Sequence, residues 1–144
     1  MALPQRRGAS AGVGATSAAA PASAEAAAAS HLVARGWTVL ARNVRVGRDE
    51  LDLLACTPAP ERELVAVEVR GRSGPGFGSG LESVDASKVA RLYRAAAALR
   101  QTGHPSLGPG PLPRPLRVDL LVLRRTGSGG WIVEAHLRGL EPPG

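Results

Sequence analysis

The sequence predicts an α/β fold in which a mixed central sheet is flanked by helices. Its apolar residues fall into segments with helical or strand spacing, in the order helix, three strands, helix, strand, strand. With 144 residues the chain has the size of one domain with a substantial core. A sheet with helices on its faces buries the apolar side of all these elements at once.

Residues 1 to 20 are rich in Ala, Gly and Ser, which bury little apolar surface, and they predict a disordered tail. The pair Arg6-Arg7 ahead of small residues is typical of an export signal. The stretch from there to Ala22, however, holds one Val and no Leu, Ile or Phe. No segment has the roughly 18 apolar residues of a membrane span. We therefore expect a cytoplasmic protein with no membrane partner, whose folded domain spans residues 21–141.

The first half of this domain predicts one helix and three strands. The Ala-rich run Ala22–Arg35 favours a helix, which the following glycine ends. Trp37–Leu40 has high strand propensity, and we expect a short basic turn over Arg42–Arg48. Two apolar strands follow, Glu50–Cys56 and Glu63–Arg70, and the Pro-containing segment between them suits a hairpin loop.

The second half predicts a helix and two closing strands. The run Gly71–Gly80 is too rich in Gly for regular structure. Val84–Gln101 predicts a long helix, because apolar residues recur at helical spacing. These residues are Val89, Leu92, Ala96 and Leu99. A loop over Thr102–Pro115 then leads to two strands, Leu116–Leu123 and Trp131–Leu137.

The composition favours a polyanionic partner. The net charge is +6, and 17 of the 18 basic residues are Arg, with Lys88 the single Lys. Excess positive charge is typical of nucleic-acid binding, although the ratio of Arg to Lys itself has a simpler origin in genomic base composition. Because Cys56 is the only cysteine, an intrachain disulfide and a Cys-based zinc cluster are excluded.

Three charged residues lie in the two adjacent apolar strands, Asp52 in one, and Glu68 and Arg70 in the other. Burying a carboxylate is costly unless a cation or several hydrogen-bond donors meet it. Side chains alternate across a strand, so Glu68 and Arg70 share one face. The three residues are therefore candidates for one site, most simply around a divalent metal.

The hairpin loop suggests how these strands pair. If Cys56 lies opposite Leu64, antiparallel pairing places Asp52 opposite Glu68, where the two carboxylates would repel each other. A hard cation such as Mg²⁺ or Mn²⁺ would turn this repulsion into attraction. Mg²⁺ commonly binds one or two protein carboxylates together with water and phosphate.

The same register makes predictions for the neighbouring positions. Glu50 would face Arg70, and Leu51 would share a wholly apolar face with Leu53 and Ala55. The alternative is that all the charges face solvent at a strand end, with Glu50 and Arg70 forming a surface ion pair that contributes little. The residue pattern leaves both interpretations open.

A series of motifs resembles the YraN-like uncharacterised protein family. In order they are Glu25–Asn43, Glu50–Ala55, Leu64–Arg72, Phe77-Gly78, Val84 with Lys88, and Arg117-Val118-Asp119. The resemblance covers about residues 24 to 138, and its specificity comes from the ordered set rather than from any single motif.

That family in turn resembles the PD-(D/E)XK nuclease superfamily, and within it the archaeal-type Holliday-junction resolvases. The resemblance implies a restriction-endonuclease-like αβββαβ core and a metal-dependent endonuclease site for branched or structured DNA. The acidic residue of the superfamily's second core strand falls on Asp52, and its Glu-X-Lys motif falls on Glu68-Val69-Arg70. The first-helix carboxylate of the resolvase-like members falls on Glu25.

The resemblance thus implies Mg²⁺ (or Mn²⁺) held by Glu25, Asp52, Glu68 and the main-chain carbonyl of Val69. Asp52, Glu68 and Arg70 would be the catalytic residues, with Arg70 at the scissile phosphate. Cleaving a symmetric junction needs two active sites, so a homodimer is expected.

Three further basic residues are candidates for nucleic-acid binding. Lys88 and Arg91 share a flank of the second helix, and Arg72 borders the Gly-rich loop. All three could meet DNA phosphates. The alternative is that the helix residues are ordinary solvated charges and the loop is a plain connector.

Two departures from the family pattern open a second interpretation. Asp49 stands where the family has Gly, and Arg70 stands where the superfamily has Lys. Arg stays protonated and cannot act as a base, although it can supply positive charge at a phosphate. The alternative function is therefore a catalytically silent DNA-binding or adaptor module that keeps the nuclease fold.

Overall fold

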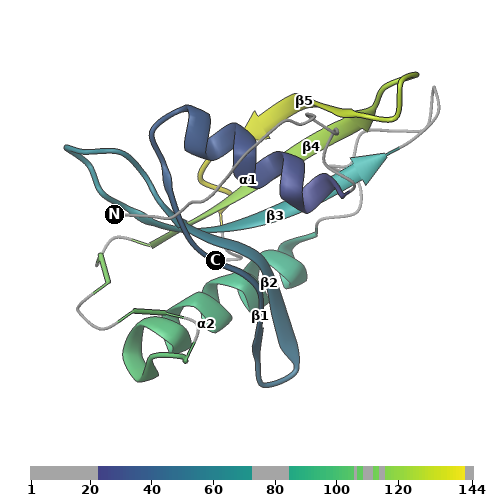
Figure 1. The fold of residues 1–144 in the computed structure, drawn as a ribbon. Coiled ribbons are helices and arrows are strands. Elements are labelled where there is room, and N and C mark those ends of the chain that lie inside the picture. The colour runs from purple at the N-terminus through teal and green to yellow at the C-terminus, as the bar shows by residue number, and fades with distance from the viewer. Residues whose placement is uncertain (1–22, 73–84, 106, 109–111, 114–115, 142–144) are drawn as a thin grey trace.

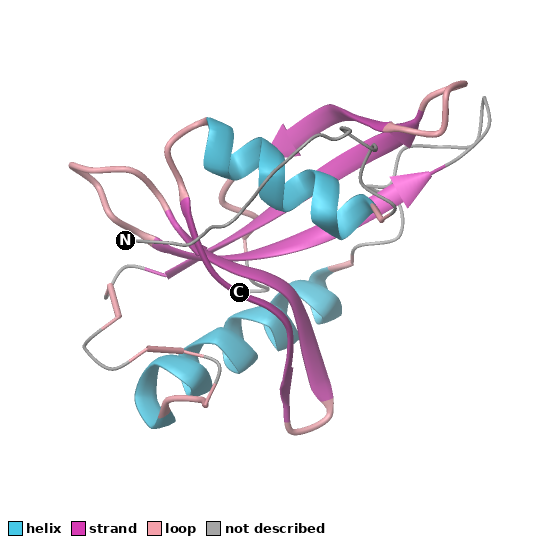
Figure 2. Ribbon diagram, viewed as in Figure 1, coloured by secondary structure: helices cyan, strands magenta, loops and turns pink. Residues whose placement is uncertain are grey.

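A five-stranded mixed sheet forms the centre of the molecule, and one helix packs on each of its faces (Figure 1, Figure 2). The computed structural model describes residues 23–72, 85–105, 107–108, 112–113 and 116–141. The predicted tail over residues 1–20 and the Gly-rich loop from residue 73 onward lie outside the described residues. The elements are α1 (Ala24–Ala34), β1 (Thr38–Val46), β2 (Asp49–Cys56), β3 (Leu64–Arg72), α2 (Ala86–Thr102), β4 (Leu116–Arg125) and β5 (Trp131–Leu137).

The strands lie in the sheet in the same order as in the chain, from β1 to β5. Neighbouring strands are antiparallel except β3 and β4, which are parallel and have α2 between them in the sequence. The predicted α/β fold with a mixed sheet is confirmed. The elements from α1 to β4 reproduce the order αβββαβ, and β5 extends the sheet at its edge.

Each face of the sheet has its own apolar core. The core under α1 includes Ala28, Leu32, Leu53, Val65, Val67 and Leu121. The core under α2 includes Leu54, Leu64, Ala66, Leu92, Leu99 and Val118. All four residues whose helical spacing predicted α2 are buried, because this spacing places them on the face that meets the sheet. Neither described helix is long and apolar enough to cross a membrane.

Both helices begin with a side-chain cap. The Ser23 hydroxyl accepts a hydrogen bond from the amide of Ala26 at 3.1 Å, and the Asp85 carboxylate accepts one from the amide of Lys88 at 2.9 Å. Such caps satisfy amide groups that have no partner within the helix. They also fix where the first turns lie, which matters because α1 carries Glu25 and α2 carries Lys88 in these turns.

The strand β1 is longer than predicted, because the expected basic turn over Arg42–Arg48 is mostly strand. It pairs with β2 as far as Val46, and Gly47 with a positive φ of 61° makes the tight turn. Arg42 and Arg45 are exposed on this strand, whereas Val44 is buried. The buried Val44 between the exposed Asn43 and Arg45 fits a strand, and the surrounding arginines concealed this pattern.

The pairing of β2 with β3 follows the predicted register. Cys56 lies opposite Leu64, and the ladder continues to Leu53 opposite Val67. The ladder ends at this pair, so Asp52, the preceding residue of β2, has no ladder partner on β3. Glu50 is therefore not paired with a residue of β3, and lies opposite Arg45 of β1 instead.

The part of the β1–β2 hairpin between Asp52 and the turn at Gly47 bends toward α2 (Figure 1). The prediction that Leu51 shares a face with Leu53 and Ala55 is wrong: Leu51 packs with Val44 in the core under α2, and the other two belong to the core under α1. On β1, Asn43 adopts a left-handed φ of 52° at this level. This irregularity lets the hairpin turn its apolar side onto α2.

Candidate functional site

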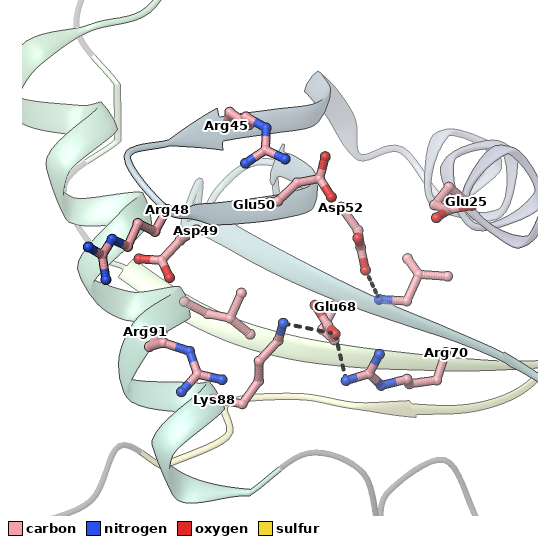
Figure 3. A pocket seen from close by; sticks show the side chains of 12 residues that line it. Glu25, Arg45, Arg48, Asp49, Glu50, Asp52, Glu68, Arg70, Lys88 and Arg91 are labelled. Atoms are coloured by element: carbon pink, nitrogen blue, oxygen red, sulfur yellow. Dashed lines mark hydrogen bonds and ion pairs between the residues drawn. The ribbon is translucent and has the colours of Figure 1, made fainter.

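A cavity of about 540 Å³ opens where the β1–β2 hairpin leaves the sheet (Figure 3). Ten charged side chains line it, five acidic and five basic. The acidic ones are Glu25, Asp49, Glu50, Asp52 and Glu68, and the basic ones are Arg45, Arg48, Arg70, Lys88 and Arg91. They come from α1, the β1–β2 hairpin, β3 and α2, so distant parts of the chain build this cavity together.

Asp52 and Glu68 meet at the centre of the cavity. Both carboxyl groups line it, the negative charge of Asp52 acts on Glu68, and Asp52 Oδ2 accepts a hydrogen bond from the amide of Val69 at 2.8 Å. The amide is free to bond Asp52 because the β2–β3 ladder has just ended. The predicted proximity of the two carboxyl groups is therefore present.

Burial changes the acidity of both groups. It raises the pKa of Glu68 to about 7; the negative charge of Asp52 adds to this effect, and the positive charges of Arg70 and Lys88 oppose it. Burial also raises the pKa of Asp52, against the hydrogen bond from Val69. Each carboxyl group of the pair therefore keeps its proton to a higher pH than it would in water.

The alternative that these charges face solvent is wrong for Glu68, which is 2% exposed. Arg70 Nη2 lies 2.9 Å from Glu68 Oε2, and Lys88 Nζ lies 3.7 Å from the same oxygen. Arg70 reaches it from two residues further along β3, and Lys88 reaches it from the first turn of α2. A lysine in a first turn is unfavourable for the helix dipole, and Glu68 compensates for it.

Glu25 lines the same cavity from the first turn of α1, and its negative charge contributes to the raised pKa of Asp52. Its position depends on Gly71 of β3, where an added Cβ would lie 2.8 Å from the Cβ of Ala24. The start of α1 therefore packs directly on the backbone of β3. Within the described parts of the chain, no three His, Cys, Asp or Glu side chains form a group able to hold a metal ion.

The central pair nevertheless suits a hard divalent cation. Two carboxyl groups line the same cavity, both with raised pKa values, so a cation bound to them would relieve the repulsion between the two carboxylates. Mg²⁺ needs one or two protein carboxylates because it keeps several waters. The metal-binding roles of Glu25 and of the Val69 carbonyl stay predictions.

Of the three other residues predicted to contact phosphate, two lie at this cavity and one does not. Lys88 and Arg91 line the cavity, and Arg91 Nη1 donates a hydrogen bond to Ser87 at 2.8 Å. Arg72 lies outside it and pairs with Glu134 of β5, with Arg72 Nη2 2.8 Å from Glu134 Oε1. Arg72 thus helps to join β3 to β5, and its contact with nucleic acid stays a prediction.

Sequence reasoning missed two cavity residues, Arg45 and Arg48 of the β1–β2 hairpin. The only signal was the basic run that begins at Arg42, and it was interpreted as a turn. The contact between Lys88 and Glu68 was also missed, because nothing local joins two residues that are twenty positions apart.

Asp119 has a structural role away from this cavity. It is fully buried and accepts hydrogen bonds from Arg117, His136 and the amide of Gly139 at 2.8 to 2.9 Å. Burial would raise the pKa of Asp119, but these hydrogen bonds outweigh burial and lower it. The residue joins β4 to β5 and to the segment that follows β5.

Comparison with known protein sequences places this chain in a family. The model of the uncharacterised protein family UPF0102 matches residues 24–123, which run from α1 into β4. A UPF0102 protein of Frankia alni is 40% identical over 109 residues, which cover 76% of this chain and 82% of that protein. A UPF0102 protein of Corynebacterium efficiens is 35% identical over 114 residues, or 78% of this chain and 84% of that protein.

Among solved structures, SfsA of Pyrococcus furiosus in complex with Ca²⁺ has 17% sequence identity and a TM-score of 0.32, over 74% of this chain and 56% of that one. A likeness this distant carries no argument about the site. The UPF0102 model, in contrast, covers every residue of the described site, and it and the sequence relatives confirm the resemblance to the YraN-like proteins. The chain belongs to the uncharacterised protein family UPF0102.

Proposed function

We propose that this protein is a metal-dependent endonuclease-like phosphodiesterase that acts on branched or structured DNA with Mg²⁺ or Mn²⁺. The observation that carries this proposal is the Asp52–Glu68 pair, whose two carboxyl groups, both with raised pKa values, line one cavity together with five cationic side chains. Acidic groups attract a metal and cationic groups attract phosphate. A phosphodiester bound to a metal ion needs both in one place.

Each residue has a defined part in this proposal. Asp52 and Glu68 hold the cation with their carboxylates, helped by Glu25 from α1 and the main-chain carbonyl of Val69. A cation held there would supply an activated water and would offset negative charge on the phosphate. Arg70 contributes a guanidinium that stays charged at any working pH and can contact two phosphate oxygens.

Lys88 supplies the ammonium group that position 70 lacks. It is the only lysine of the chain and already reaches Glu68 Oε2 from α2. The cavity therefore contains an acidic pair, a guanidinium and an ammonium, although the motif on β3 has Arg in place of Lys.

One observation favours the second candidate, a catalytically silent DNA-binding or adaptor module. Arg70 and Lys88 both contact Glu68, so two fixed cations already compensate its charge without a metal. A site of this kind would still bind phosphate through its arginines, and it would need no divalent ion to do so.

Binding and cleavage of a four-way DNA junction, measured with and without Mg²⁺, separate the two candidates. For the enzyme we expect Mg²⁺-dependent cleavage that Asp52→Asn abolishes while junction binding persists. The matched control is Glu61→Gln, which removes an exposed carboxylate in the β2–β3 loop. Binding without cleavage under any divalent ion supports the silent module, and absence of binding at low salt contradicts both candidates.

A further inference from the structure

The β1–β2 hairpin places two arginines at the cavity that have no partner among the described residues. Arg45 and Arg48 are exposed, line the cavity, and form no hydrogen bond or ion pair with any described residue. The other basic groups of the cavity differ in this respect. Arg70 and Lys88 contact Glu68, and Arg91 bonds Ser87.

The hairpin is firmly attached to α2, so its arginines have a defined position. Val44 and Leu51 are buried in the core under α2, and Asp49 Oδ2 lies 3.5 Å from Arg94 Nη2. Because Asp49 is paired with Arg94, it does not neutralise its neighbour Arg48. The hairpin and α2 therefore form one wall of the cavity, which carries Arg45, Arg48 and Arg91 beside the acidic Asp49 and Glu50.

Arg48 and Arg91 stand together at a boundary between two cavities. Both line the central cavity, and both also line an adjoining cavity of about 670 Å³ between the hairpin and α2. Figure 3 shows them on one side of the Asp52–Glu68 pair, with Arg70 on the other side. Cationic groups thus flank the carboxyl pair on both sides.

We propose that Arg45, Arg48 and Arg91 bind a second phosphate of the same nucleic-acid strand, next to the phosphate held at Asp52 and Glu68. This inference rests on the proposed function and narrows its substrate. The strand must continue past the reacting phosphodiester on the hairpin side, so the substrate is a nucleic-acid strand with at least two phosphates and not an isolated phosphodiester. Guanidinium groups suit this task because they contact phosphate oxygens in pairs.

The first test is the salt dependence of junction binding for the double variant Arg45→Gln/Arg48→Gln. Loss of one phosphate contact should make the slope of log K against log salt less negative by about 0.9 on duplex DNA, with weaker binding for every sequence. The control is Arg62→Gln, which removes the same charge from an exposed position in the β2–β3 loop and should leave the slope nearly unchanged. An unchanged slope in the double variant overturns the proposal.

The second test compares a DNA oligonucleotide with bis(p-nitrophenyl) phosphate, an ester that has one phosphate and no neighbouring one. In the double variant, the ratio of oligonucleotide to ester hydrolysis should fall about 10-fold or more relative to the wild type. An unchanged ratio would place these arginines at the reacting phosphate and overturn the second-phosphate inference. If the wild type hydrolyses neither substrate, the enzymatic proposal fails, and the salt slope alone then decides whether the hairpin binds phosphate.

Discussion

Glu68 shows how one buried residue links stability to function. It is almost fully buried, lies near the negative charge of Asp52 and contacts both Arg70 and Lys88. Its pKa in the folded protein is raised to about 7 from an ordinary value of 4.5. The protonated form is therefore favoured by folding. The stability that it contributes is fully present below pH 4.5 and is lost as the pH rises through about 7.

Replacing Glu68 with Gln should raise the stability of the metal-free protein at pH 8. The amide imitates the protonated carboxyl group, so the cost of burying the charge disappears. The shift in pKa corresponds to at most about 3 kcal/mol of unfolding free energy. Thermal unfolding at pH 5 and pH 8 measures this effect: the variant should gain several degrees at pH 8 and much less at pH 5. The exposed Glu61→Gln control should show no such difference, and equal shifts at both pH values would contradict the assignment.

Position 70 has Arg where the nuclease superfamily has Lys. Substitutions that change the size or the charge of this side chain can identify its role. If its guanidinium stabilises charge on the phosphate, Arg70→Lys should be nearly neutral for cleavage, and Arg70→Ala should slow it about 100-fold or more. Single-turnover cleavage of the same junction by the three forms measures this. A faster Arg70→Lys variant would show that the site needs lysine chemistry at this position. Unchanged cleavage by Arg70→Ala would show that the site is wrongly assigned.

At the scale of elements, the packing of α1 on β3 decides where Glu25 lies. A Cβ on Gly71 would meet Ala24 at 2.8 Å and the ring of Trp131 at 3.0 Å. Gly71→Ala should therefore destabilise the protein by about 1–3 kcal/mol, because the helix has to move away from the strand. Chemical denaturation measures the loss, and Ala24→Gly in the same chain should recover part of it.

A matched control for this change is Gly127→Ala in the β4–β5 turn, where an added Cβ has no atom within 4 Å. This variant should keep its stability to within about 0.5 kcal/mol. If Gly71→Ala is equally neutral, α1 does not pack on β3 as closely as described, and the position of Glu25 must be revised.

Asp119 holds β4, β5 and the following segment together, and its acidity predicts the opposite pH dependence to that of Glu68. Its pKa is lowered by three hydrogen-bonding partners, so its contribution is present above the ordinary pKa of 3.8 and is lost as the pH falls further. Asp119→Asn should cost about 3–5 kcal/mol near pH 7, because Arg117 keeps a partly buried charge without its main partner. Denaturation at several pH values should show this deficit shrinking below pH 4, and a deficit independent of pH would contradict the electrostatic explanation.

At the scale of the whole molecule, the charge of +6 and the five basic side chains of the cavity predict DNA binding that depends strongly on salt and weakly on sequence. If five phosphates are contacted, the slope of log K against log salt should be about −4 to −5. Titration of junction and duplex DNA at several salt concentrations measures the slope. A flat response would remove nucleic acid from the proposed function.

Local patterns in the sequence were sufficient to predict the order of the elements and the pairing of β2 with β3. The helical spacing of Val89, Leu92, Ala96 and Leu99 predicted the buried side of α2, and the pairing of Cys56 with Leu64 was correct as far as Leu53. These features depend on alternation and periodicity within a few residues, so they can be read from a short segment. The pair of Asp52 and Glu68 followed from the same register.

Only the tertiary structure decided which charges meet around that pair. The hairpin bends between Asp52 and its turn at Gly47. This bend places Leu51 against α2 and brings Arg45 and Arg48 to the cavity. The docking of α2 brings Lys88 to Glu68, while Arg72 is directed to Glu134. Sheet twist and helix packing set these positions through contacts between residues that are far apart in the chain. The sequence around a charged residue does not indicate which partner the residue will contact after packing. The acidic pair was therefore predictable, and the basic residues around it were not.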